Sequence, residues 1–385
     1  MLLLRIFLPA VGLLFSHTAV VIGQSFTQTH GGASAQDGIG CMATADGYLA
    51  GVRAHDPVAL EHTGELYVLN GSGNLTGTNV LPLSNEVFLQ AMANGPQGSA
   101  FLVGSLLTTA GAEHEGVIVK LNANGSPEWT TLFEGPASQQ FFGAVALPDG
   151  GAIACGTTNI NGTHDALVAR FGADGTLVWS TTDPVATDAD AYAVAVADGV
   201  VMVTGRRMTF GGTSDILLWR LDMDGNPIWT SSYGRSADEE GRAIIAQGPS
   251  IFIVAGWTNS FGRFDVSTGR IPDHAYLMAV DLEGDTLWAQ AVGDTVFRHR
   301  AYALSNAPNG DLLLAGERID QGRSDALLIR RTASGAPIWE RTIDTGKEER
   351  LLHLLPLADG MVATGWSFAE FGRQLLVVRR NADGF

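Results

Sequence analysis

The sequence predicts an all-β protein, a seven-bladed β-propeller closed by an N-terminal strand that completes the last blade. Three observations carry this prediction. A unit of about 50 residues recurs along the chain. Each unit reads as four short strands joined by tight turns, and the last unit lacks its fourth strand while a spare strand-like segment stands near the start. Four-stranded antiparallel units that repeat around an axis form a propeller.

The first 23 residues have the pattern of a secretory signal peptide, with Arg5 ahead of an apolar run and small residues near Gly23. We expect a mature chain from about Gln24, one propeller domain over residues 24–385, and a location outside the cytoplasm, either secreted or in the cell envelope (periplasm or cell surface). An uncleaved N-terminal anchor is the alternative. No later stretch reaches about 18 consecutive apolar residues, so we expect no transmembrane segment in the mature chain.

The third unit shows the four strands best, as FGAVALP, AIACG, DALVARF and TLVWSTT, with turns that contain Asp-Gly. A glycine in the second strand marks each unit. These glycines are Gly51, Gly104, Gly156, Gly205, Gly256, Gly316 and Gly365, which predicts seven blades. Residues 25–36 align with the segment that follows the fourth blade and place Phe26 where other units have tryptophan. This strand should complete the seventh blade and remove an exposed sheet edge.

A tryptophan recurs on the fourth strand of five units. The five are Trp129, Trp179, Trp229, Trp288 and Trp339. A large flat ring at a repeated position suits the wedge between neighbouring sheets, so we expect a packing role. Contact with a ligand is the alternative.

The unit at residues 149–179, DGGAIACGTTNINGTHDALVARFGADGTLVW, resembles the secreted bacterial β-propeller repeats of the delta-sixty kind. The resemblance covers essentially the whole mature chain. It implies an extracellular or envelope repeat domain, often part of a surface or adhesion-related protein, and it transfers no catalytic residue. Quinone-dependent dehydrogenase repeats also end in a turn and a tryptophan, but they need a cofactor site that this sequence does not show. In sialidase Asp-boxes glycine stands three residues before tryptophan, whereas here Gly225 stands four before Trp229.

The formal net charge of −17 argues against nucleic acid as a partner, because phosphate binding needs clustered lysine and arginine. Cys41 and Cys155 fall in units that are not neighbours, so we expect two buried free thiols and no disulfide. We expect a monomer.

Function should lie where the repeats differ from one another. The loops that enter the first strands and those that join the second and third strands should open on one face. One arc of this face should be acidic, and the arc at blades 6 and 7 should be basic. The fifth unit carries the longest insertion, residues 258–274, and we expect Trp257 and Trp366 on loops of this face. Aromatic rings beside charged groups suit a carbohydrate or protein ligand. The candidate ligand-binding residues are Trp257, Trp366, Arg206, Arg318, Glu317 and Arg300. An ordinary solvated rim, with both tryptophans capping their blades, is the alternative.

Catalytic and metal motifs are missing from the sequence: it has no HExxH, nucleophile elbow or P-loop. We therefore assign no catalytic residue, no metal ligand and no cofactor. The leading hypothesis is a secreted bacterial binding or adhesion propeller for an extracellular carbohydrate or protein. The alternatives are a structural module of an envelope assembly and a carbohydrate-active hydrolase or lyase, in which carboxylates such as Asp190, Glu240 and Glu317 would pair across the channel.

Overall fold

The computed structural model describes residues 24–385 apart from 33, 57, 60, 84–85, 108–112, 136, 160–161, 186–187, 262–270, 294–295 and 371. The predicted signal peptide lies outside the described residues, as does much of the 258–274 insertion. Within the described part of the chain, no helix has the length and apolar character needed to cross a membrane.

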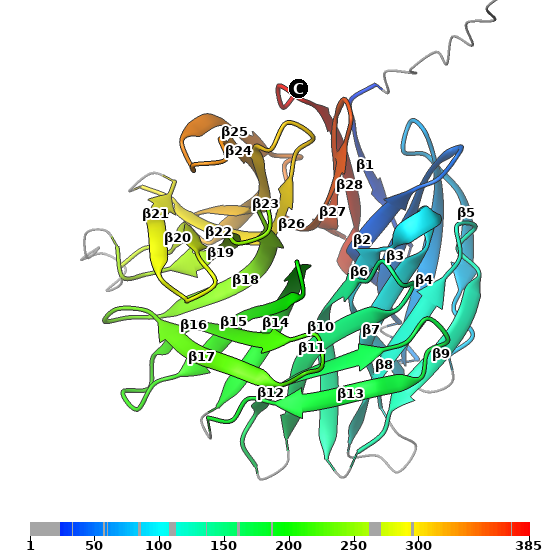
Figure 1. Ribbon diagram of the computed structural model, residues 1–385. Helices are drawn as coiled ribbons and strands as arrows, with labels where there is room; N and C mark the ends of the chain where they lie inside the picture. Colours follow the sequence, from blue (N-terminus) through cyan, green and yellow to red (C-terminus); the bar gives the residue numbers. More distant parts are fainter. Residues whose placement is uncertain are drawn as a thin grey trace, which may run out of the picture.

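The described residues form seven four-stranded antiparallel sheets in a ring (Figure 1). Blade 1 contains β2 (Ala35–Ala43), β3 (Gly47–Asp56), β4 (Glu61–Asn70) and β5 (Leu75–Val80). Blade 2 contains β6 (Glu86–Asn94), β7 (Ala100–Leu107), β8 (His114–Leu121) and β9 (Pro127–Phe133), with a 3-10 turn, η1 (Pro96–Gly98), after β6. Blade 3 contains β10 (Ser138–Ala146), β11 (Ala152–Asn159), β12 (Asp165–Phe171) and β13 (Leu177–Thr182).

Blade 4 contains β14 (Ala189–Ala197), β15 (Val200–Met208), β16 (Ser214–Asp222) and β17 (Pro227–Tyr233). Blade 5 contains β18 (Glu239–Ala246), β19 (Phe252–Thr258), β20 (His274–Val280) and β21 (Thr286–Val292). Blade 6 contains β22 (Arg298–Asn306), β23 (Leu312–Asp320), β24 (Arg323–Arg331) and β25 (Pro337–Ile343). Blade 7 contains β26 (Glu349–Leu357), β27 (Gly360–Ala369), β28 (Gly372–Asn381) and, from the other end of the chain, β1 (Phe26–His30).

The ring is closed by β1, as the sequence predicts. β1 pairs antiparallel with β28, from Phe26 opposite Arg379 to His30 opposite Leu375. In Figure 1 the blue β1 accordingly lies beside the red β28. The guanidinium of Arg380 also donates 2.8 Å hydrogen bonds to the carbonyl oxygen of Phe26 and the hydroxyl of Thr27. The fold is therefore a seven-bladed β-propeller whose last blade combines both ends of the described chain.

The repeated tryptophans join neighbouring blades. The indole Nε1 of Trp179 in blade 3 donates a 2.9 Å hydrogen bond to the carbonyl oxygen of Met223, in the turn between the third and fourth strands of blade 4. Its ring packs against Gly225 of the same turn, where a Cβ would lie 2.6 Å from the ring. Arg170, opposite Trp179 in the sheet, donates to the same carbonyl at 3.1 Å. Phe26 occupies the corresponding place in blade 7, facing Arg379 and packing near Gly73 of blade 1.

Both cysteines are fully buried and free, as predicted. Cys155 lies in the apolar core between blades 3 and 4, near Trp219, and Cys41 lies between blades 7 and 1. Burial raises the pKa of the Cys41 thiol to about 12. Each core is thus formed by the facing surfaces of two sheets, which is why the blades stabilise one another.

The second-strand glycines are needed because a side chain would clash with the first strand, close to the bulges that face the central channel. At Gly156 a Cβ would lie 1.8 Å from the carbonyl oxygen of Gln140 on the first strand. This close approach occurs where the first strand bulges between Phe141 and Gly143. In blade 1 Gly51 lies in the second strand as predicted, but one residue before the pairing position that glycine holds in the other blades. Val52 stands at that position, opposite Gly38.

Candidate functional site

A bulge in the first strand of every blade supplies one side chain to the central channel. The residues that the bulges leave out of the pairing are Ile39, Gln90, Phe142, Tyr192, Arg242, Tyr302 and Leu352. A bulge residue leaves the hydrogen-bonded ladder and its side chain is redirected. All seven line a cavity of about 640 Å³ along the axis of the ring. The same bulge in each blade therefore lines the channel with seven side chains of different chemical character.

Five arginines line this cavity near the end where the first strands begin and the second strands finish. We call them the arginine mouth: Arg53, Arg242, Arg300, Arg350 and Arg373. Each is bound to a carboxylate behind it, for example Arg53 to Asp37 at 2.7 Å and Arg350 to Glu317 at 2.8 Å. Asp37 also binds Arg373, at 3.2 Å.

The carboxylates and the arginines of these ion pairs differ in burial. The side chains of Asp37 and Glu317 are 5% and 0% exposed, whereas those of Arg350 and Arg373 are 31% and 41% exposed. The carboxylates therefore fix the arginines from below, and guanidinium groups are what the cavity presents to solvent. This is a local reversal in a chain with a formal net charge of −17.

Aromatic rings orient the same arginines. The guanidinium of Arg242 lies 4.1 Å from the ring centre of Tyr192, and that of Arg350 lies 5.0 Å from Tyr302 and 5.2 Å from Trp366. Such stacking favours a planar cation over a ring face. The hydroxyl of Tyr302 donates a 2.7 Å hydrogen bond to Glu317, and burial raises the pKa of Tyr302 to about 12. The arginines are thus held by rings and carboxylates before any ligand arrives.

The structure brings four of the sequence-predicted residues into this arrangement. Arg300 and Trp366 line the cavity. Glu317 lies behind it and is bound to Arg350. Trp257 lies beneath Arg300, whose guanidinium is 4.6 Å from the indole.

The remaining two predicted residues make other contacts. Arg206 donates to Asp190 at 2.8 Å, and the guanidinium of Arg318 lies 3.5 Å from the ring of Phe297. Neither is among the residues that line the axial cavity.

Trp257 and Trp366 do not stand on loops, so that part of the prediction is wrong. They belong to β19 and β27 and are 8% and 7% exposed. The second strand continues beyond its glycine in both blades, which places each indole in the sheet under an arginine. They support the arginine mouth and offer little surface of their own.

Sequence reasoning missed Tyr192, Arg242, Tyr302 and Arg373. A signal for the first three exists in the tetrapeptides DAYA (190–193), EGRA (240–243) and RAYA (300–303), where a large residue recurs between small ones. The wall also includes Arg53, Gln90 and Phe142 from blades 1 to 3. All seven blades therefore contribute to the cavity, and the residues that line it lie in strands, not in the irregular loops.

Comparison with known families finds a match over much of the propeller. The profile of a family described as outer membrane protein assembly factor BamB matches residues 114–355, from β8 to β26. No curated protein matches the sequence. The match supports a repeat β-propeller, while the finer resemblance to delta-sixty repeats stays a prediction. Because the profile covers more than half of the chain, the protein belongs to the family of outer membrane protein assembly factor BamB.

Proposed function

We propose that this protein is a non-catalytic binding propeller of the bacterial cell envelope, and that its arginine mouth binds an acidic segment of a protein partner. One observation carries the proposal: the arginines are partly exposed, while the carboxylates that orient them are buried. A ligand entering the channel meets guanidinium groups, which bind carboxylates through paired, charge-assisted hydrogen bonds.

The family supports a protein as the partner. Its description refers to the assembly of outer membrane proteins, which takes place in the cell envelope. The predicted export signal at residues 1–23 is consistent with such a location. An assembly factor needs to hold polypeptide without altering it, and a channel whose groups are already oriented lowers the ordering cost of binding.

The ion pairs of the channel carboxylates with arginines favour a binding role over a catalytic one. Asp190 accepts from Arg206, Glu240 is paired with Arg242, and Glu317 accepts from Arg350 and Tyr302. A glycoside hydrolase needs one carboxyl group as acid and another as base or nucleophile, both facing the substrate. Here each carboxylate already has a cation, so the hydrolase alternative finds no support in these contacts.

Site-specific photo-cross-linking in the intact envelope tests the proposal. A photoreactive phenylalanine analogue replaces Phe142 in the channel wall, and the matched control replaces Ile338, which is 45% exposed on the outer strand β25. We expect protein adducts at position 142 and none at position 338. Adducts at 338 alone, or adducts at 142 that resist protease and yield to glycosidase, would contradict a protein partner at the mouth.

A further inference from the structure

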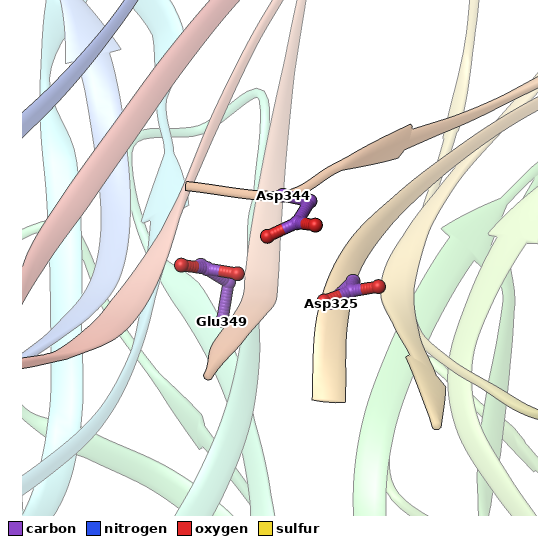
Figure 2. Close-up of side chains that lie close together, drawn as sticks. All are labelled: Asp325, Asp344 and Glu349. Carbon is purple, nitrogen blue, oxygen red and sulfur yellow. The ribbon is translucent and has the colours of Figure 1, made fainter. Parts of the chain in front are cut away.

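One carboxylate cluster lies away from the channel, at the junction of blades 6 and 7. Asp325 lies near the start of the third strand of blade 6, Asp344 follows the fourth strand, and Glu349 begins the first strand of blade 7 (Figure 2). One oxygen from each lies within 4.8 Å of the others. Figure 2 shows the three carboxylates facing a shared space from three separate segments.

The three equivalent positions at two other junctions hold fewer carboxylates. Between blades 4 and 5 the position of Asp344 is taken by Gly234, which leaves Asp215 and Glu239. Between blades 3 and 4 the positions of Asp344 and Glu349 are taken by Pro184 and Ala189, which leaves Asp165, although Asp183 and Asp188 act on Asp165 from neighbouring positions. The third carboxylate at the 6/7 junction is therefore not required by the repeat.

The charges at this junction are not balanced. Arg323 donates to Asp325 at 3.0 Å and also to Asp344, so one guanidinium serves two carboxylates. Glu349 is 0% exposed, and its Oε2 is buried without a hydrogen-bond partner. Its other oxygen accepts from the hydroxyls of Thr345 and Ser367. Three carboxylates and one arginine leave a net charge of −2, and burying an unpaired charge is costly.

We propose that Asp325, Asp344 and Glu349 bind a calcium ion that links blade 6 to blade 7. A donor set made only of oxygen suits a hard cation and lacks the nitrogen and sulfur ligands typical of zinc. Ca²⁺ accepts irregular geometry and more ligands than Mg²⁺, which demands near-ideal octahedral positions. Asp344 is 52% exposed at the side chain, so water can complete the coordination from that side.

Arg323 is the competing cation. Its side chain is 46% exposed, and it can move into solvent when the ion enters. The ion would then neutralise Glu349, which Arg323 does not reach with any observed hydrogen bond. Because β26 opens the blade that β1 closes, calcium at this junction would stabilise the closure of the ring. This inference is independent of the proposed function.

Calorimetric titration of the chelator-treated full chain with CaCl₂ tests the site. We expect one ion per chain with a Kd of about 10⁻⁴ to 10⁻³ M, as in extracellular calcium modules. Asp344→Asn and the isosteric Glu349→Gln should each weaken binding by at least about tenfold because a charged ligand is lost. Arg323→Gln should tighten it, because the competitor is removed.

The matched control is Asp215→Asn at the junction of blades 4 and 5, which should bind calcium as the unchanged protein does. Addition of CaCl₂ should raise the thermal midpoint of the unchanged protein and of Asp215→Asn, but not that of Asp344→Asn. No calcium heat up to about 10 mM, far above the expected Kd, would overturn the proposal. Calcium binding by folded Asp344→Asn equal to that of the unchanged protein would also overturn it.

Discussion

The indole Nε1 of Trp229 in blade 4 donates a 2.9 Å hydrogen bond to the carbonyl oxygen of Leu282 in blade 5. Arg220, which faces Trp229 in the sheet, donates to the same oxygen at 2.7 Å. The turn of blade 5 is thereby held by two side chains of blade 4. Equivalent contacts recur around the ring, so these repeated residues make the separate sheets into one structure.

Trp229→Ala should lower the free energy of unfolding by about 2 to 4 kcal/mol, near the lower part of the range for truncated core aromatics because the ring is half-buried. Trp229→Phe should cost less, since it keeps most of the apolar contact and loses the hydrogen bond, worth about 1 kcal/mol. Urea unfolding of both variants measures the difference. Phe210→Ala is the control, because Phe210 is fully exposed. A loss below about 1 kcal/mol for Trp229→Ala would show that the ring contributes little to blade contacts.

Removal of β1 should destabilise the entire ring. In a chain that begins at Ala35, β28 loses its β1 partner along five positions, from Arg379 to Leu375. The side of β28 that faces away from β27 then becomes an exposed sheet edge. We expect a lower and less cooperative thermal transition. Adding a peptide of residues 24–34 should restore part of the lost stability by pairing with β28. An unchanged midpoint and cooperativity without the peptide would mean that the ring closes without this strand.

His353, in the wall of the channel, should make stability depend on acidity. Burial lowers the pKa of its imidazole to about 4 in the folded protein, from an ordinary value of 6.5. The unfolded chain therefore binds a proton at a higher pH than the folded chain does. The corresponding stability is present above pH 6.5 and is lost as the pH falls towards 4, by at most about 3 kcal/mol.

His353→Gln removes this term, so its destabilising effect should shrink between pH 7 and pH 4. Denaturant unfolding of the two proteins across that range measures the change. Curves that stay parallel would show that His353 titrates alike in the folded and unfolded chains.

The sequence predicts the fold because the propeller is a local unit repeated. Turn glycines, strand patterns and the recurring tryptophans each predict the local structure of one hairpin. Because the pattern occurs in seven copies, the fold can be predicted from it. Even the closing strand can be aligned, since Phe26 faces Arg379 as Trp229 faces Arg220. Pairing register is harder to predict: in blade 1 Val52, and not Gly51, occupies the pairing position that glycine holds in the other blades.

The site is harder to predict because bulges decide which side chains face the channel. Strict alternation along β18 does not reveal that Arg242 leaves the ladder and lies over Tyr192. Trp257 and Trp366 follow strand glycines and look like loop residues, yet the second strands extend past them. The cluster of Asp325, Asp344 and Glu349 is also hidden in the sequence, because its residues come from three segments and two blades.

The most direct test of the arginine mouth is binding of the full chain to an array of peptides and glycans, repeated with Arg242→Gln/Arg373→Gln. Both arginines line the cavity. After these substitutions both carboxylate partners still have a positive charge nearby. Asp37 still binds Arg53 when Arg373 is replaced, and Glu240 still interacts with the charge of Arg206 when Arg242 is replaced. Arg331→Gln/Arg341→Gln on the outer strands is the control with the same loss of charge. We predict that acidic peptides bind, that salt weakens the binding, and that only the Arg242/Arg373 variant loses at least about tenfold in affinity, or 1.4 kcal/mol. Binding that prefers neutral glycans, or that is unchanged in the Arg242/Arg373 variant, would contradict the account.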